Sequence, residues 1–574
     1  MLKKVIPYTK HYRKEIFLTP LFMVLEVFAD ILIPLLMITL VDEGIAKNDI
    51  ALVYRQALFM VVAAIFGMFF GGISSYFGAK AGYGMAGNLR KAAYAAIQKF
   101  SFSNIDKISV PSLITRLTTD IETIGMVGMM SLRMAFRAPF MLIFALFFSF
   151  RINSGLAIIF AVTLPLSALA IALIFRKVMP IFQESRRRVD DLNGIIQEQL
   201  SGMRIIKAFV RNKTAEAEFE KRNRATLNTE LRAIRIVQIM NPIFTLMIYT
   251  ALLFILYNGG RQVYEGTMLP GTIIGFSTYV IQIMVSLMMI SMFLANFSFG
   301  ITSLRRVLEI LETRSEITTP EHPVTEVPDG SIRFDHVSFC YPGYKDNILE
   351  DVTLSIASGE TVGIIGPTGS SKSTLVKLIP RLYDAQSGAV IVGGHNVKDY
   401  GPLALRRAIG FVLQNNTLIS GTIASNMRWG NAQATDEQIV DALQKAQAWE
   451  FVSRYPDTIN HPVEQGGANF SGGQKQRLTI ARALLTEPKI LILDDSTSAL
   501  DMSTDARLRR VLRDHREDMT TLIIAQRIAS IREADQIIVL DEGRVAATGT
   551  HESLIRDSEI YREIVQSQEG GLAQ

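Results

Sequence analysis

The residues best suited to chemistry begin with a glycine- and serine-rich loop at Gly366–Ser373. The apolar run Val362–Ile365 before it predicts a buried strand, and Lys372 onward predicts the start of a helix. In that strand–loop–helix setting, backbone N–H groups converge on one point and suit a polyphosphate. The spacing follows the pattern G-x-x-x-x-G-K-[ST], except that Ser371 stands where the pattern has glycine.

Each part of this loop has an expected role. Lys372 is expected to reach the outer phosphates, and the Ser373 hydroxyl to bind a magnesium ion. The structural alternative is a Gly/Ser turn that merely precedes an amphipathic helix. The other expected nucleotide contacts in the loop and the first helical turn are Gly366, Thr368, Gly369, Ser370, Ser371 and Thr374.

Two consecutive carboxylates follow another strand-like run, Ile490–Leu493. Asp494 ends that predicted strand, and a strand that delivers Asp494 to the phosphate-binding loop would place it to hold Mg²⁺. Asp495 comes next and is expected to orient an attacking water molecule. The sequence therefore predicts a site for phosphoryl chemistry built from two separate stretches.

A second glycine-rich stretch, Phe470–Gln474, precedes a predicted helix at Lys475–Leu485. Its glycines and the exposed helix N-terminus form another phosphate-binding surface. One chain does not need two such surfaces for one nucleotide. We therefore expect two chains arranged head to tail, each offering Ser471, Gly472, Gly473 and Gln474 to the nucleotide of the other.

Composition excludes an ordinary soluble enzyme. The 574 residues are 49% hydrophobic, and the mean hydropathy is +0.25. A net charge of +5 is small for this length and gives no reason to expect a nucleic-acid partner. The single cysteine, Cys340, excludes an internal disulfide.

Six apolar stretches are long enough to cross a bilayer. The segments between them alternate in length, and the two long connections and the N-terminus carry most of the cations. The positive-inside rule therefore places these parts, and everything after the sixth span, in the cytoplasm. The predicted spans lie near 16–40, 56–78, 128–150, 155–177, 240–259 and 271–298.

The two long connections are rich in Ala, Leu, Glu, Lys and Arg. Each is predicted to be a pair of helices that extends the spans into the cytoplasm, with turns within Asp106–Leu113 and Ala208–Thr214. A polar, proline-bearing linker follows at 312–329. The predicted fold is an all-α membrane domain at 1–311, an α/β P-loop nucleotide-binding domain at 330–566, and a short tail at 567–574.

The order of these motifs resembles a half-transporter of the ATP-binding-cassette superfamily, of the exporter type. The resemblance rests on the loop at Gly366, on Phe470–Gln474, on Leu491–Asp494 and on Ser498–Asp501. It implies ATP and Mg²⁺ as cofactors and covers nearly the whole chain.

Further roles follow from that resemblance alone. It implies that Tyr341 stacks on adenine, the structural alternative being a half-buried strand tyrosine. Gln414 corresponds to the glutamine that senses magnesium and lies at the contact with the membrane domain. Ser498–Asp501 corresponds to the loop that crosses the dimer interface, and Gln526 stands where the family usually has a switch histidine.

Two departures from the family pattern are informative. Asp495 replaces the usual glutamate, and its shorter side chain ends about 1 to 1.5 Å short of the water. Gln526 cannot exchange a proton as histidine can. Together with an intact Phe470–Gln474 motif, these changes resemble the subunit of heterodimeric exporters that binds ATP at a weakly hydrolysing site.

The sequence thus predicts a multi-pass subunit of the cell membrane, most consistent with a bacterial plasma membrane. Its expected partners are a homologous half-transporter with an intact catalytic site, amphipathic drug-like substrates and membrane lipid. The alternatives are a homodimeric lipid or peptide exporter and a non-hydrolysing regulatory ATP-binding subunit or ATP-gated pore.

Four charges fall within the predicted spans, where ionisable groups pair or face a water-filled cavity. At 1.5 Å per residue, Glu26 and Arg137 lie at similar depths of about 15 and 13 Å and are predicted to pair. Asp30 lies deeper, at about 21 Å, with no cation expected at its level, so it is predicted to be a cavity carboxylate that favours cationic substrates. The alternative is one structural cluster that also includes Arg133.

Overall fold

The structure is a computed structural model that describes residues 2–495, 500–514 and 519–569. The chain forms two compact units, which are described separately. The first contains Met1–Ile97 and Leu113–Glu312, and the second contains Gln98–Ser112 and Thr313–Gln574. The second unit therefore includes a short stretch from the predicted cytoplasmic arm.

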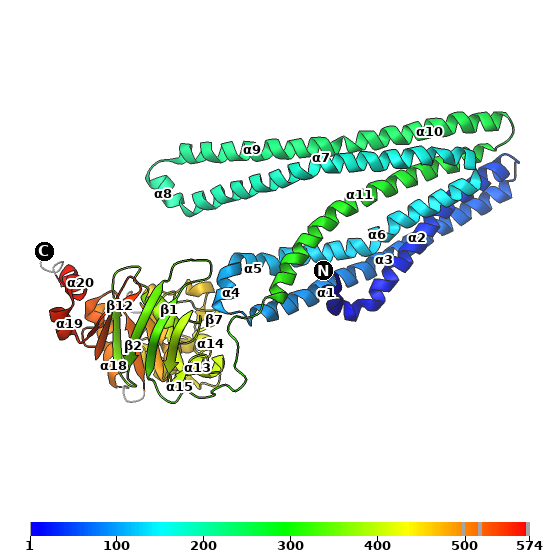
Figure 1. The fold of residues 1–574 in the computed structure, drawn as a ribbon. Coiled ribbons are helices and arrows are strands. Elements are labelled where there is room, and N and C mark those ends of the chain that lie inside the picture. The colour runs from blue at the N-terminus through cyan, green and yellow to red at the C-terminus, as the bar shows by residue number, and fades with distance from the viewer. Residues whose placement is uncertain (1, 496–499, 515–518, 570–574) are drawn as a thin grey trace. The chain divides into compact units, whose positions relative to one another are not determined.

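In its described residues the first unit contains helices and turns but no strand, and six of its helical segments are long and apolar enough to cross a membrane, as predicted. The helices pack in two groups: α2, α3 and α6 contact one another, while α7 contacts α9 and α10, and α11 contacts both groups (Figure 1). Its helices are α1 (Leu2–Val5), α2 (Arg13–Thr39), α3 (Ile50–Ile97), α6 (Thr119–Ile152), α7 (Ser154–Ser201), α8 (Met203–Ala208), α9 (Asn212–Gln238), α10 (Met240–Tyr264) and α11 (Pro270–Glu312).

Glycines on α3 allow it to approach α2 and α6 closely. A Cβ atom at Gly82 would lie 2.7 Å from the Gly125 carbonyl oxygen of α6, and one at Gly71 would lie 2.9 Å from the Glu26 carboxyl carbon of α2. Small residues at such contacts are typical of membrane helices, because packing rather than hydrophobicity holds the helices together in lipid. Gly71 also leaves the space that the Glu26 carboxylate occupies.

The intramembrane charges are centred on Arg137. Its guanidinium forms an ion pair with Glu26, which confirms the predicted pair. The expectation that no cation lies at the level of Asp30 is wrong: Arg137 Nη2 lies 3.0 Å from Asp30 Oδ2, so one arginine bridges both acids. Glu26 and Asp30 are four residues apart on one helix face. The fork-shaped Arg137 guanidinium is wide enough to reach both carboxylates, although they lie at different depths in the membrane. Arg133 instead donates to the Ser75 hydroxyl at 3.4 Å.

The second unit begins with a short helix that the sequence reading did not separate from the arm, α4 (Phe102–Ile108). A capping box starts it, because the Ser101 hydroxyl accepts from the Asn104 amide and the Asn104 side chain accepts from the Ser101 amide. It ends at Ser109, whose φ of 65° breaks the helix before α5 (Val110–Leu117), which continues into the first unit. The break lies within the predicted turn region.

The linker is attached to α4. The Ser103 hydroxyl donates to Glu316 Oε2 at 2.6 Å, and Lys107 forms an ion pair with the same carboxylate. The hydrogen bond from Lys107, and to a smaller extent that from Ser103, lowers the pKa of Glu316. The contact of α4 with this linker explains why a piece of the predicted arm belongs to the second unit.

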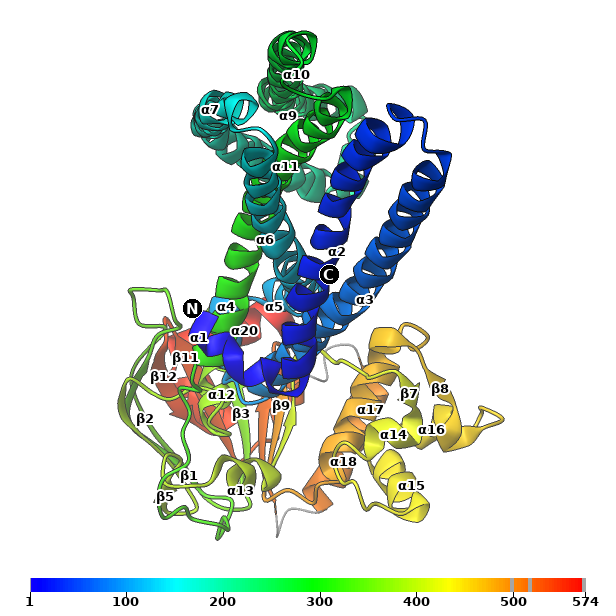
Figure 2. The same ribbon diagram turned by 90° about the vertical axis from the view of Figure 1, so that its right-hand side faces the viewer.

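Two sheets and a helical layer make up the rest of the second unit (Figure 2). One sheet has the order β2-β1-β4-β5 and the other β12-β11-β3-β10-β9-β6, with β7 and β8 forming a separate pair. The strands are β1 (Ile332–Phe339), β2 (Leu349–Ile356), β3 (Thr361–Ile365), β4 (Ser387–Val392), β5 (His395–Asn396), β6 (Ile409–Val412), β7 (Gly421–Thr422), β8 (Pro462–Val463), β9 (Ile490–Asp494), β10 (Thr520–Ile524), β11 (Gln536–Asp541) and β12 (Arg544–Gly549).

The central strands of the larger sheet end in register. β10 pairs in parallel with β3 and with β9, so that Ile524 lies opposite both Ile364 and Asp494. All five residues of β9 and of β10 are buried, as expected for parallel strands covered on both faces. Three connecting loops therefore leave the sheet at one edge, the usual position of ligand sites in such sheets.

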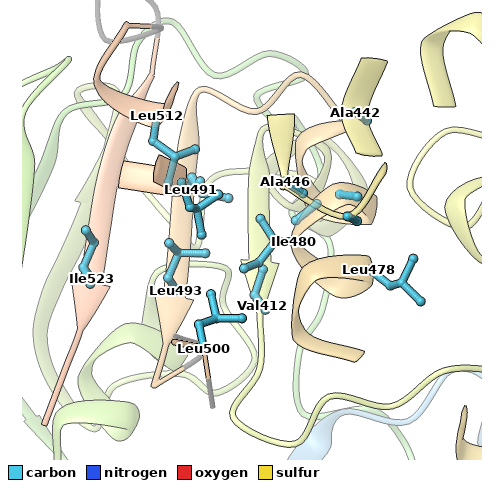
Figure 3. Packing of buried hydrophobic residues seen from close by; sticks show 14 of the residues in the cluster. Val412, Ala442, Ala446, Leu478, Ile480, Leu491, Leu493, Leu500, Leu512 and Ile523 are labelled. Atoms are coloured by element: carbon cyan, nitrogen blue, oxygen red, sulfur yellow. The ribbon is translucent and has the colours of Figure 1, made fainter. Parts of the chain in front are cut away.

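The helical layer fixes the second glycine-rich motif. Ile480 of α17 packs in the same buried cluster as Val412 of β6 and Leu493 of β9 (Figure 3). This packing sets the direction in which the N-terminus of α17 projects. The helices of the second unit, besides α4, are α12 (Lys372–Leu378), α13 (Pro402–Arg407), α14 (Ile423–Met427), α15 (Asp436–Lys445), α16 (Trp449–Val452), α17 (Gly472–Leu484), α18 (Met502–Asp514), α19 (His551–Asp557) and α20 (Glu559–Glu569).

The bridging role of Arg137 gives a stability prediction for the first unit. Arg137→Gln leaves two largely buried carboxylates without their cation, so we expect a loss of about 3–5 kcal/mol, seen as a lower midpoint in thermal unfolding in detergent. Arg133→Gln, which removes one long hydrogen bond, is the matched control and should lower the midpoint much less. Equal losses for the two variants would contradict the bridge.

Candidate nucleotide site

The loop between β3 and α12 wraps around the Lys372 ammonium. Its Nζ donates to the carbonyl oxygens of Gly366 at 2.9 Å and Pro367 at 2.8 Å, and to Ser370 Oγ at 3.2 Å. Gly369 has a φ of 91°, and a Cβ there would meet no atom within 4 Å, so the loop is open on that side. Ser371 has a φ of 69°, a left-handed conformation that favours the glycine of the pattern.

Ser373 and Asp494 meet, as the magnesium prediction requires. Ser373 Oγ donates to Asp494 Oδ1 at 2.7 Å, and Asp494 is almost fully buried. Among the described residues, no group of three or more His, Cys, Asp or Glu is arranged to hold a metal. The hydroxyl–carboxylate pair fits Mg²⁺, which takes few protein ligands and completes its shell with water and phosphate oxygens. Burial raises the pKa of Asp494, while the Ser373 hydrogen bond and Lys377 oppose the rise.

Asp495 is held by amides. The Gln526 amide nitrogen donates to Asp495 Oδ2 at 2.8 Å, and Gln414 also hydrogen bonds to this carboxylate. Burial and the neighbouring Asp494 raise the pKa of Asp495, and the two amides and Lys372 counteract the rise. The pKa of the Lys372 ammonium is lowered by burial, against the opposing charges of Asp495 and Asp494.

Most of the predicted nucleotide contacts line one cavity of about 750 Å³. Ser370 and Asp494 are buried beside it. The sequence did not predict the four lining residues of α20, since nothing in the helix pattern of α20 indicates which side faces the cavity. The predicted residues that line it are Tyr341, Gly366, Thr368, Gly369, Ser371, Lys372, Ser373, Thr374, Gln414, Asp495 and Gln526; those not predicted are Ile348, Ile365, Pro367, Ile524, Glu563, Ile564, Ser567 and Gln568.

Tyr341 connects the cavity to α4. Its hydroxyl lies 3.2 Å from Thr374 Oγ1, and its ring meets the Tyr383 ring edge-on at 5.1 Å. The Tyr383 hydroxyl donates to Asp106 Oδ2 of α4 at 2.7 Å. Burial, together with the Asp106 hydrogen bond, raises the pKa of Tyr383. An aromatic contact and a hydrogen bond thus link the expected adenine position to a helix that is continuous in sequence with the membrane spans.

The motif Phe470–Gln474 does not line this cavity. Ser471 and Gln474 form a capping box that starts α17, and Ser471 and Gly472 are exposed. Phe470 anchors the motif, with its ring 6.1 Å from His461 and 6.2 Å from Tyr455. The motif is therefore an exposed, capped helix start that lies outside the cavity of its own chain.

The predicted interface loop lies partly outside the described residues, because 496–499 include Ser498. Its last residue, Asp501, is described. The carboxylate of Asp501 accepts from the Ser503 hydroxyl at 2.6 Å and from the Thr504 amide at 2.9 Å, and these bonds lower its pKa. Asp501 thereby caps the first turn of α18.

Comparison with known proteins agrees with this geometry. The family described as "ABC transporter transmembrane region" matches residues 16–305, and the family described as "ABC transporter" matches residues 349–498. The chain belongs to the ATP-binding-cassette (ABC) transporter family. The second match contains both the Lys372 loop and the Asp494–Asp495 pair, so these residues belong to an ABC ATP-binding domain.

Relatives match this ABC half-transporter from end to end. The uncharacterized ABC transporter ATP-binding protein YfiB of Bacillus subtilis is 34% identical over 99% of both chains. The putative ABC transporter ATP-binding protein exp8 of Streptococcus pneumoniae is 30% identical over 100% of this chain and 98% of its own. A solved bacterial Atm1-family ABC exporter with ATP bound has the same fold, with a TM-score of 0.81 at 24% identity over 97% and 98% of the two chains. The protein is therefore a multi-pass ABC exporter subunit with a cytoplasmic nucleotide-binding domain.

The left-handed conformation of Ser371 gives a prediction about the loop. Ser371→Gly relieves the backbone strain but adds unfolded-state entropy, so we expect stability and ATP affinity to change by less than about 1 kcal/mol. Ser371→Val places a β-branched side chain at positive φ and should cost more than 1 kcal/mol and weaken binding of a fluorescent ATP analogue. If Ser371→Val left stability and nucleotide binding as little changed as Ser371→Gly, the left-handed conformation at residue 371 would be contradicted.

Proposed function

We propose that this chain is one half of a heterodimeric exporter that moves amphipathic, drug-like compounds out of the membrane. Its own ATP site binds Mg²⁺ and ATP but hydrolyses slowly. Its Phe470–Gln474 motif completes the site of a homologous partner, where most hydrolysis takes place. The observation that carries this proposal is the hydrogen bond of Gln526 to Asp495, described above.

The first support is the reach and engagement of Asp495. A carboxylate that orients water must lie within hydrogen-bond reach of it. Aspartate is one methylene shorter than glutamate, and a misplacement of about 1 Å can reduce a rate about 100-fold. Asp495 also accepts hydrogen bonds from two amides, Gln526 and Gln414, which compete with a water for its lone pairs.

The second support is the chemistry of Gln526. An amide cannot become a cation or pass a proton at neutral pH, whereas an imidazole at the same position can do both. Here the amide nitrogen donates to Asp495, and Gln526 lines the cavity. The Gln526–Asp495 pair therefore favours retention of bound ATP over its repeated hydrolysis.

The third support is the state of the motif at the start of α17. Its serine, glycines and glutamine all follow the pattern, its capping box is formed, and it does not line the cavity of its own chain. A chain that hydrolyses ATP slowly at its own site, but carries an intact Phe470–Gln474 motif, is best suited to a heterodimer. ATP supplies binding energy when it joins two nucleotide-binding domains, and the equilibrium between separated and closed domains drives the membrane helices.

The proposal predicts that activity depends on pairing. The purified full-length chain should bind ATP yet hydrolyse it at a few per cent of the rate of the assembled complex at most, because both composite sites of a homodimer contain Asp495 and Gln526. The measurement is phosphate release from the chain alone and after co-expression with candidate partners. ATP hydrolysis by the chain alone at the rate of the complex would favour a homodimeric exporter and contradict the proposal.

Substitutions in the complex should separate the two sites. Asp495→Ala should lower the hydrolysis rate less than threefold, because this carboxylate serves the slower site. Gly472→Asp places a carboxylate on the surface offered to the competent site and should lower the rate about 100- to 1,000-fold. Steady-state ATPase assays in nanodiscs measure both. A reversal of this order would mean that the roles of the two sites are exchanged.

A further inference from the structure

The C-terminal helix α20 forms one wall of the ATP cavity. Four of its residues line that cavity, at positions 563, 564, 567 and 568. The helix is also anchored in the core: Tyr561 is fully buried and Val565 is 7% exposed, both within the same core cluster as the strand residues of the larger sheet. The helix is therefore a fixed part of the site rather than a loose tail.

Helical spacing determines where Gln568 points. Tyr561, Val565 and Gln568 are related by four and three residues, so they share one face of α20. Because the first two are held in the core, the third is carried toward the segment that follows β10. Gln566, two residues away, is exposed on another face of the helix.

Both ends of the Gln568 amide are engaged with the backbone of that segment. Its nitrogen donates to the Gln526 carbonyl oxygen at 2.7 Å, and its oxygen accepts from the Ile528 amide at 2.8 Å. Gln526 is the residue whose side chain donates to Asp495. The Gln568 side chain thus holds the backbone on both sides of Arg527. One of the two groups it holds is the carbonyl of Gln526, the residue whose side chain contacts the Asp495 carboxylate.

We propose that Gln568 is a positioning residue for this ATP site: it clamps the switch segment Gln526–Ile528 so that the Gln526 amide stays on Asp495. The inference deepens the proposed function and rests on its assignment of Asp495 and Gln526. The clamp keeps the amide–carboxylate contact closed and slows the exchange of nucleotide. Loss of the clamp frees the segment, so the Gln568 side chain determines how long ATP stays bound.

The expected size of the effect follows from the two hydrogen bonds. Both hydrogen bonds restrain the segment and each makes a modest net contribution. Loss of the pair should raise the local opening equilibrium of the segment about 10-fold. A side chain that merely contributes to overall stability would not confine its effect to this segment.

The test compares Gln568→Ala with Gln566→Ala in the full-length chain in nanodiscs, by hydrogen exchange monitored with mass spectrometry. For Gln568→Ala we expect exchange in peptides covering Gln526–Ile531 to be about 10-fold faster, with peptides of β9 and α17 unchanged. Gln566→Ala should match the wild type everywhere. Unchanged exchange in Gln526–Ile531 for Gln568→Ala would overturn the proposal, and so would an equal acceleration throughout the domain.

Two further measurements complete the test. Dissociation of Mg²⁺–MANT-ATP from the full-length chain should be several-fold faster for Gln568→Ala than for Gln566→Ala, and an unchanged rate would overturn the role in nucleotide retention. Gln568→Glu keeps the acceptor for the Ile528 amide but not the donor, so it should fall between wild type and Gln568→Ala, and it serves if the alanine variant does not fold. High ATPase activity of the chain alone would contradict the proposed function but leave the exchange result interpretable.

Discussion

Parallel strands that end in register bring the parts of this ATP site together. β10 pairs with β9 so that Ile524 lies opposite Asp494, and the Asp495 amide donates to the Ile524 carbonyl oxygen at 3.1 Å. Two residues beyond Ile524, the Gln526 side chain is within 2.8 Å of Asp495. β3 on the other side of β10 delivers the phosphate-binding loop to the same edge. The contact between the amide and the carboxylate is thus a consequence of sheet register, and its chemistry follows from the two residue types found there.

The same edge is bounded by elements from distant parts of the sequence. Tyr341 and Tyr383 lead from the cavity to Asp106 of α4, and Gln568 of α20 holds the switch segment from behind. The cavity therefore has one side linked through aromatic rings to α4 and another bounded by the C-terminal helix. We infer that nucleotide retention is governed through the second.

The sequence was sufficient to predict the six spans, the α/β domain and the convergence of Lys372, Ser373 and Asp494, because these depend on apolar periodicity and on motifs with fixed spacing. It also paired Glu26 with Arg137 by depth. It failed for Asp30, because a depth estimate per residue ignores the reach of a guanidinium that can bridge two acids on one helix face. It also missed α20, because helix periodicity shows that Tyr561 and Val565 share a face but not which loop lies beyond them. The short helix α4 was merged with the arm, since its capping box is a local signal within a long helical pattern.

The most direct test of the account is the fate of ATP bound at the two sites of the assembled complex. In a single-turnover experiment, both sites are filled with radiolabelled ATP and Mg²⁺, excess unlabelled ATP is added, and the bound nucleotide is analysed over time. The account predicts that about half of the bound label is converted rapidly to ADP while the other half remains ATP over many turnovers of the first, a difference of about 100-fold or more in rate. Conversion of all the bound label in one phase would contradict the assignment of this chain's site as a slow one.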